Sequence, residues 1–226
     1  MIYIKKTILF IGDSVTDCNR DRLNMQRNLY ASENYGTGYA NLVASYLGAE
    51  FPEMYTFYNR GICGARLPDV YSNLVRDILT LKPDYISILI GVNDIMHGFE
   101  VHNGTTPVRF EKIYNMLLDE IIEELPSTKI MIMEPFVLPE PENYSTNSDP
   151  NRFHAFDSGL RNLSAIARSA AEKHNLPFVE LQRVFSDASA KTADDYWLFD
   201  GVHPTANGHE LIKRMWLKTF SSLRSE

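Results

Sequence analysis

The chain has few cysteines, no excess of positive charge and no long apolar run, the features expected of disulfide-rich, nucleic-acid-binding and membrane proteins. Its 226 residues include two cysteines, Cys18 and Cys63, so at most one disulfide can form, and we expect both as free thiols. The formal net charge is −7. This charge is spread along the chain, which argues against the cationic face of a nucleic-acid binder and against docking on an anionic membrane. No apolar run approaches the roughly 18 residues of a membrane-spanning helix.

The first residues have one feature of a signal peptide, because two lysines precede an apolar run. That run, Ile8–Ile11, is too short for the apolar part of a signal peptide, and no small-residue cleavage site follows it. We interpret it as a first β-strand and expect a cytoplasmic protein.

Several catalytic signatures are also missing. The sequence contains no G-x-S-x-G, no phosphate-binding G-x-x-x-x-G-K-[ST], no G-x-G-x-x-G and no H-E-x-x-H. These absences leave the nucleophile elbow of α/β-hydrolases and nucleotide chemistry unsupported, and we expect neither a metal nor a cofactor. Asp200 and His203 could ligate a metal only with a third ligand, for which His97 or His154 would be the candidate.

Short β-rich runs alternate with amphipathic segments along the chain. Such alternation predicts right-handed βαβ units, and hence a flavodoxin-like three-layer α/β/α sandwich around a parallel sheet of about five strands. We expect one domain over residues 1–226, with the proline-rich segment Glu134–Pro150 as an irregular wall of the site. The predicted strands are Thr7–Ile11, Tyr55–Asn59, Tyr85–Ile90, Lys129–Met133 and Pro177–Leu181, and the predicted helices are Gly38–Leu47, Asp69–Leu81, Pro107–Leu125, Arg152–His174 and Thr205–Phe220.

Ligands of open parallel sheets bind beyond the carboxyl ends of the strands, so the residues that follow each strand matter most. Ser14, Gly61 and Asn93 follow the first three predicted strands, and Asp200 and His203 precede the last helix. Taken singly, each has an ordinary explanation as a helix cap, a turn residue or an exposed histidine. Together they provide a nucleophile, its base, the carboxylate that orients the base, and donors for an oxyanion.

The blocks GDS, NRGICG, GVND and DGVHP resemble, in this order, those of the SGNH (GDSL) hydrolases, over nearly the whole chain. The resemblance implies that Ser14 forms an acyl-enzyme, that His203 transfers the proton and that Asp200 orients this histidine. It also implies an oxyanion hole made by the backbone N–H groups of Ser14 and Gly61 and the side chain of Asn93.

The sequence segments around these blocks are similar to those of intracellular carbohydrate acetylesterases, notably xylo-oligosaccharide acetylesterases. They include GDSVTDCNR, GTGYANLV, KPDYISILIGVNDI and DGVHPTANGHELI. This similarity implies a small ester substrate such as an acetylated sugar, no cofactor, and a homo-oligomer, since relatives assemble.

Candidate substrate-binding residues are Asp13, Arg60, Tyr196 and Trp197. Asp13 is next to the predicted nucleophile, with the organisation of a turn as its alternative role, and Arg60 could hold a sugar hydroxyl or balance neighbouring acids. Tyr196 and Trp197 offer aromatic faces to a sugar or an acyl chain, with core packing as the alternative, more so for Phe199.

The sequence thus predicts a serine esterase that hydrolyses short-chain carboxylic esters, most specifically one that deacetylates carbohydrates. A short-chain lipase, thioesterase or lysophospholipase with the same triad is an alternative. A non-catalytic carbohydrate-binding relative is an alternative from another class, because a fold does not guarantee a function.

Overall fold

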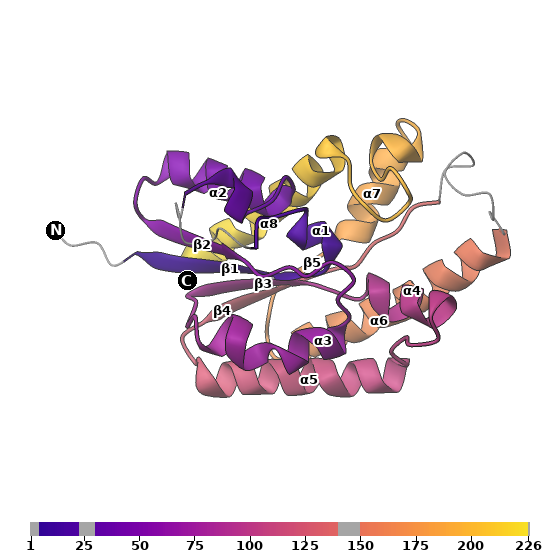
Figure 1. Cartoon of the computed structure of the whole chain (residues 1–226), viewed down its shortest axis with the longest axis horizontal. Helices are drawn as coiled ribbons and strands as arrows, with labels where there is room; N and C mark the ends of the chain where they lie inside the picture. Colours follow the sequence, from indigo (N-terminus) through magenta and orange to yellow (C-terminus); the bar gives the residue numbers. More distant parts are fainter. Residues whose placement is uncertain (1–4, 23–29, 140–149, 226) are drawn as a thin grey trace.

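A five-stranded parallel sheet forms the centre of the molecule. The computed structural model describes residues 5–22, 30–139 and 150–225. The strand order is β2-β1-β3-β4-β5, and every pairing is parallel (Figure 1). This order confirms the predicted flavodoxin-like sheet, in which the order of strand addition reverses between β1 and β3. The strands are β1 (Lys6–Gly12), β2 (Tyr55–Asn59), β3 (Tyr85–Leu89), β4 (Lys129–Met133) and β5 (Phe178–Val179).

Helices cover both faces of the sheet. Figure 1 shows α2, α7 and α8 over one face and α3, α5 and α6 over the other. In the described part of the chain, no helix is long and apolar enough to cross a membrane. The α-helices are α1 (Ser14–Asp17), α2 (Tyr39–Glu50), α3 (Leu67–Ser72), α4 (Val92–Glu100), α5 (Pro107–Glu124), α6 (Pro150–Lys173), α7 (Leu181–Ser189) and α8 (Ala206–Ser225), with 3₁₀ turns at Ser32–Asn34 and Asp194–Tyr196 and a π-helical turn at Val75–Leu79.

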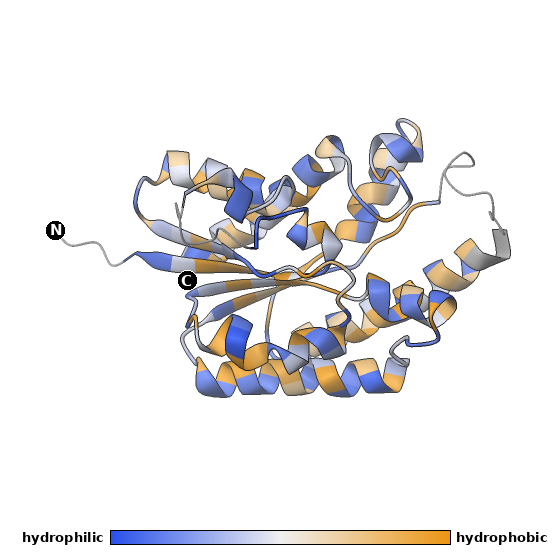
Figure 2. Cartoon of the chain, viewed as in Figure 1, coloured by the Kyte–Doolittle hydropathy of each residue, from blue (hydrophilic) through white to orange (hydrophobic). Residues whose placement is uncertain are grey.

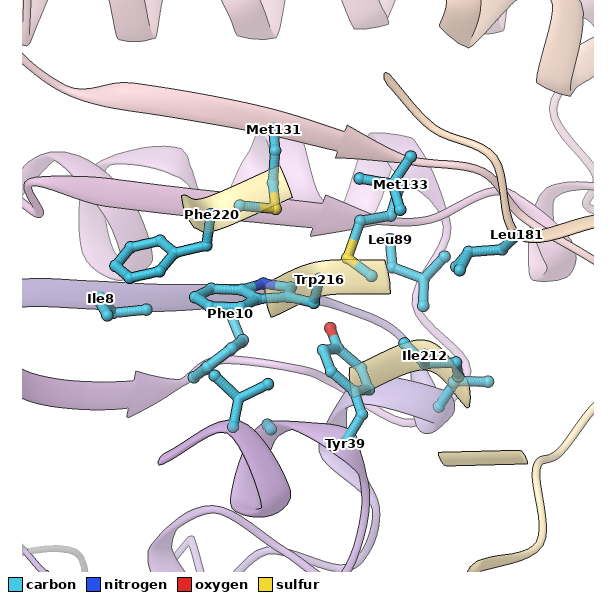
Figure 3. Close-up of a cluster of buried hydrophobic side chains, with 14 of the residues drawn as sticks. Ile8, Phe10, Tyr39, Leu89, Met131, Met133, Leu181, Ile212, Trp216 and Phe220 are labelled. Carbon is cyan, nitrogen blue, oxygen red and sulfur yellow. The ribbon is translucent and has the colours of Figure 1, made fainter. Parts of the chain in front are cut away.

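The strands are apolar on both faces because both faces are covered. Ile8 and Phe10 of β1 belong to the core under α2 and α8, whereas Leu9 and Ile11 belong to the core under α3, α5 and α6. Trp216 of α8 packs on Phe10 with ring centroids 5.6 Å apart (Figure 3). Figure 2 shows apolar residues concentrated in the strands and on the inward sides of the helices.

The secondary structure differs from the sequence prediction in several respects. The predicted helix Asp69–Leu81 is two pieces, because Asn73 leaves helical geometry and its side chain donates to the carbonyl of Asp69. The predicted strand Pro177–Leu181 is two residues long, since the chain leaves the sheet at Glu180 and Leu181 begins α7. Helices α4 and α7 are both short and were not predicted.

The segment after β4 forms a wall against the loop that carries Asp200 and His203. Residues 134–139 are non-helical, as predicted, and the N–H of Leu138 donates to the carbonyl of Gly201 over 2.9 Å. Both backbone groups of Val137 are bonded to the side-chain amide of Gln182. Residues 140–149 of the predicted irregular segment lie outside the described residues.

Candidate active site

Ser14 is presented at the carboxyl end of β1. The strand ends at Gly12, where a Cβ would collide with the side chain of Thr16 and the carbonyl of Leu89. Asp13 then caps α1, because its Oδ1 accepts the N–H of Val15 over 3.0 Å. The chain therefore turns sharply and places Ser14 at the start of the short helix.

Ser14, His203 and Asp200 form a continuous hydrogen-bonded chain. Ser14 Oγ lies 2.8 Å from His203 Nε2, and His203 Nδ1 lies 2.6 Å from Asp200 Oδ2. The other oxygen of Asp200 accepts the N–H groups of Val202 (3.0 Å) and His203 (2.7 Å). One carboxylate therefore holds both the imidazole and the backbone that carries it.

The pKa shifts of Asp200 and His203 suit the transfer of a proton from Ser14 to His203. Burial disfavours the charge of Asp200, but the hydrogen bonds from His203 and from two backbone N–H groups outweigh it and lower the pKa of this carboxyl. The hydrogen bond to Asp200 raises the pKa of His203 above its ordinary value of 6.5, against the opposing effect of burial. With Asp200 ionised, Nδ1 of a neutral His203 carries the proton and Nε2 can accept one from Ser14.

Gly61 lies where another side chain would not fit. A Cβ at this position would collide with the backbone of Asp17 in α1. The N–H of Gly61 donates to Oδ1 of Asn59 over 2.9 Å, and its carbonyl accepts from the guanidinium of Arg20. A developing oxyanion would therefore share this donor with Asn59 or take it over.

Asn59 is a site residue that the sequence reasoning missed. Its buried amide also donates to the carbonyls of Thr16 (2.6 Å) and Tyr35 (2.9 Å). It therefore ties the end of β2 to α1 and to the segment before α2. Its position as the last residue of a predicted strand was the available signal.

Asn93 lies in the first turn of α4, after Gly91, which has a φ of 138°. One N–H of its side-chain amide donates to the carbonyl of Ala65 over 3.0 Å, so the second N–H of this amide can serve another acceptor. The neighbouring Asp94 organises the turn, because its carboxyl accepts the N–H of Leu67 (3.0 Å to Oδ2). Burial raises the pKa of Asp94 to about 7.

The candidate substrate-binding residues occupy different environments. Asp13 is buried in its capping role, and burial raises its pKa to about 7. Arg60 lies 4.0 Å from Asp77 and over the ring of Tyr58. Tyr196 is half exposed, and its ring meets that of Trp197 edge to face.

The aromatic side chain beside the triad is Phe199. Its ring stacks on that of His203 with centroids 5.7 Å apart, and 44% of the residue is exposed. Trp197, a candidate from the sequence, packs against the core under α8, which is the alternative that the sequence left open for it.

A second histidine, His209, links the helices around the site. Its Nδ1 accepts the N–H of Tyr39 over 3.1 Å, and its Nε2 lies 3.4 Å from Sγ of Cys18. Burial lowers the pKa of His209 to about 4. Cys18 and Cys63 are both free thiols. Among the described residues, no group of three His, Cys, Asp or Glu side chains is placed to hold a metal ion.

A small hollow lies at the carboxyl end of the sheet, between the ends of β1 and β3, the segment after β4 and the loop that carries His203. Its volume is about 10 Å³, close to the minimum that admits one water molecule. The lining is apolar apart from one buried carboxyl, and it consists of Asp13, Val15, Leu89, Val92, Pro135, Phe136 and Val202. The three valines are next to Ser14, Asn93 and His203 in the sequence.

A parallel sheet with a serine, a histidine and a carboxylate joined at its carboxyl edge defines a class of serine hydrolases unlike the α/β-hydrolases with their G-x-S-x-G elbow. The sequence matches the GDSL-like lipase/acylhydrolase family over residues 10–211. The protein belongs to this family and is an esterase of the GDSL (SGNH) type.

Relatives cover nearly the whole chain. An acetylxylan esterase from Geobacillus stearothermophilus is 30% identical over 221 residues, which are 93% of this chain and 92% of that protein. A candidate GDSL-like lipase from Parabacteroides merdae has a similar structure, with a TM-score of 0.85, 33% identity and 96% of each chain covered. A catalytic mutant of the Geobacillus esterase superposes with a TM-score of 0.80, 28% identity and 96% of each chain covered.

Proposed function

We propose that this esterase removes acetyl groups from carbohydrates through an acyl-enzyme on Ser14. The observation that carries the proposal is the chain of hydrogen bonds from Ser14 through His203 to Asp200. The similarity to an acetylxylan esterase supports an acetylated sugar as the substrate.

In the first half of the reaction, Oγ of Ser14 attacks the acetyl carbonyl carbon and its proton passes to Nε2 of His203. The second N–H of the Asn93 amide and the backbone N–H groups of Ser14 and Gly61 stabilise the oxyanion. When the tetrahedral intermediate collapses, the ester C–O bond breaks and the sugar hydroxyl leaves with the proton from His203.

In the second half, His203 takes a proton from water as the water oxygen attacks the acetyl-Ser14 carbonyl. Collapse of this intermediate breaks the bond to Ser14 Oγ, which recovers the proton, and releases acetate. The balance is one ester and one water converted to one alcohol and one carboxylic acid, so the residues of the chain suffice for every proton transfer.

The small hollow beside the triad supports a short acyl group. Its apolar lining of Val92, Pro135 and Val202 suits a methyl group, and its volume is about 10 Å³. A lipase or thioesterase would need a longer apolar channel for its acyl chain.

The test compares initial rates on p-nitrophenyl acetate, butyrate and octanoate, together with acetate release from acetylated xylobiose. We expect the acetyl ester to be preferred and the sugar to be deacetylated. Both activities should be lost in Ser14→Ala and kept in Ser45→Ala, which removes an exposed hydroxyl on α2. Preference for octanoate without sugar deacetylation would assign the triad to a lipase or thioesterase, and absence of Ser14-dependent turnover would contradict the mechanism.

A further inference from the structure

A groove of about 460 Å³ lies beyond the end of β4, between α6 and the start of α7. Arg161, Ser164 and Arg168 line it from α6, while Glu134 and Gln182 line it from the opposite side. Its volume lies within the range of pockets that bind small molecules. Of the predicted site, only the start of the wall segment, Glu134 and Pro135, lines it.

Three polar residues of the groove, of which Ser164 is buried and Glu134 and Gln182 are partly buried, form a fixed framework. The hydroxyl of Ser164 donates to one oxygen of Glu134 over 2.6 Å, and the backbone N–H of Gln182 donates to the other over 3.0 Å. The side chain of Gln182 is held in turn by both backbone groups of Val137. This framework keeps its shape before any ligand arrives, which reduces the entropy cost of binding.

The two arginines provide the donors that a ligand could use. Nε of Arg161 bonds to Asp157 and one Nη of Arg168 bonds to Glu180, each over 2.8 Å. A guanidinium carries five N–H donors, so most of them remain available. Within the lining, the two arginines are balanced by two carboxylates, Glu134 and Asp157, which favours an uncharged ligand over an anion.

Apart from Ser169, the rest of the lining is apolar. Pro135, Leu160 and Ala165 provide carbon surface to the groove. A sugar chain has the matching chemistry, since its rings have apolar C–H faces and edges of hydroxyl groups that accept and donate hydrogen bonds.

The groove and the small hollow share part of their lining. Pro135 lines both of them. Leu160 of the groove belongs to the same apolar cluster as Val92 and Val202, the sequence neighbours of Asn93 and His203. We propose that this groove binds the non-reacting part of an uncharged oligosaccharide whose acetyl group lies at Ser14, an inference that rests on the proposed function.

The first experiment removes the two guanidinium groups. We expect the double variant Arg161→Gln/Arg168→Gln to raise KM for acetylated xylotetraose by about tenfold or more, as the loss of a charge-assisted hydrogen bond would. The kinetics with p-nitrophenyl acetate, which has no sugar, should be unchanged. The matched control is Arg183→Gln, because Arg183 forms a similar exposed pair with Asp187 on α7 but does not line the groove.

A second variant blocks the groove without removing a charge. Ala165→Trp should fill the space from an exposed position on α6, whereas Asn162→Trp places the same ring on an exposed position of that helix outside the lining. We expect the first alone to slow deacetylation of the tetraose, with both variants keeping wild-type turnover of p-nitrophenyl acetate.

The outcomes separate the two proposals. If sugar deacetylation is robust but the groove variants match their controls, the groove proposal is wrong and the proposed function stands. If p-nitrophenyl acetate is hydrolysed while no acetylated sugar is, the proposed function fails, and the groove proposal fails with it.

Discussion

Two histidines six residues apart, His203 and His209, show how the surroundings of one side chain determine what it can do. Nδ1 of His203 faces the carboxylate of Asp200, which only accepts, so this nitrogen carries the proton and Nε2 can accept one. Nδ1 of His209 faces the backbone N–H of Tyr39, which only donates, so this nitrogen is an acceptor and the proton lies on Nε2. The two rings are therefore opposite tautomers.

The pKa values of the two histidines differ as well. The hydrogen bond to Asp200 raises the pKa of His203, whereas burial without a carboxylate partner lowers the pKa of His209 to about 4. One imidazole can cycle its proton near neutral pH, and the other is a neutral connector between helices. The partner of Nδ1 thus shows whether a histidine in this region can act as a base at Nε2.

The strongest test of this contrast is His203→Ala. We expect loss of about 10⁴-fold or more in turnover of p-nitrophenyl acetate, because the variant leaves Ser14 without a base. Circular dichroism should show an unchanged fold, since a third of the side chain is exposed. Turnover above about one per cent of wild type would remove His203 from the catalytic role.

Asp200→Asn tests whether the partner of Nδ1 sets the tautomer. We expect a loss of up to about 10⁴-fold, the effect of the corresponding change in the worked serine-protease case. Since the attack requires neutral His203, kcat/KM should rise with pH and level off above the pKa of this group.

The pH dependence of kcat/KM provides a second test of Asp200→Asn. In the wild type, the midpoint of that rise should lie above 6.5, because Asp200 raises the pKa of His203. In Asp200→Asn it should move to lower pH, because the charge is removed. An unchanged midpoint would mean that another group controls the profile.

Asn93→Ala separates charge stabilisation from proton transfer. Removal of one oxyanion donor typically lowers kcat by about 10² to 10³. We expect this smaller loss with the midpoint of the pH profile unchanged, because the His203–Asp200 pair is intact. Asn162→Ala on the exposed face of α6 is the control. A shifted pH midpoint in Asn93→Ala would mean that Asn93 acts on the base.

The sequence predicted the parallel sheet, and it selected three residues that the structure joins by hydrogen bonds, because both depend on patterns local to the chain. Buried parallel strands read as continuous apolar runs, and an acid three residues before a histidine in one loop can reach its near ring nitrogen. The link from Asn59 to the Thr16 carbonyl spans 43 residues and is set by how α1 packs on the end of β2. No local pattern contains that information.

The directions of the Trp197 and Phe199 side chains could not be predicted from the local sequence either. Trp197 and Phe199 are two residues apart and chemically alike, yet one packs on the core and the other on His203. Trp197 is the C-cap of the 3₁₀ turn Asp194–Tyr196, whereas the backbone N–H of Phe199 donates to the carbonyl of His203 over 3.0 Å, a contact that forms only when the loop closes on itself.

The smallest effect on catalysis should come from His209→Gln, although its effect on stability should be clear. The pKa of His209 lies below the unfolded value of 6.5, so the unfolded chain binds more protons between pH 6.5 and about 4. The contribution of His209 to the free energy of unfolding is therefore fully present above pH 6.5 and is lost as pH falls toward 4, on the order of 3 kcal/mol across that range.

His209→Gln should flatten this part of the stability curve in urea unfolding. Turnover at pH 8 should stay within about tenfold of wild type because no reacting group is removed. His102→Gln, which changes an exposed histidine, should keep the wild-type slope. Loss of activity as large as that of His203→Ala would mean that the tautomer difference between the two histidines does not separate their roles.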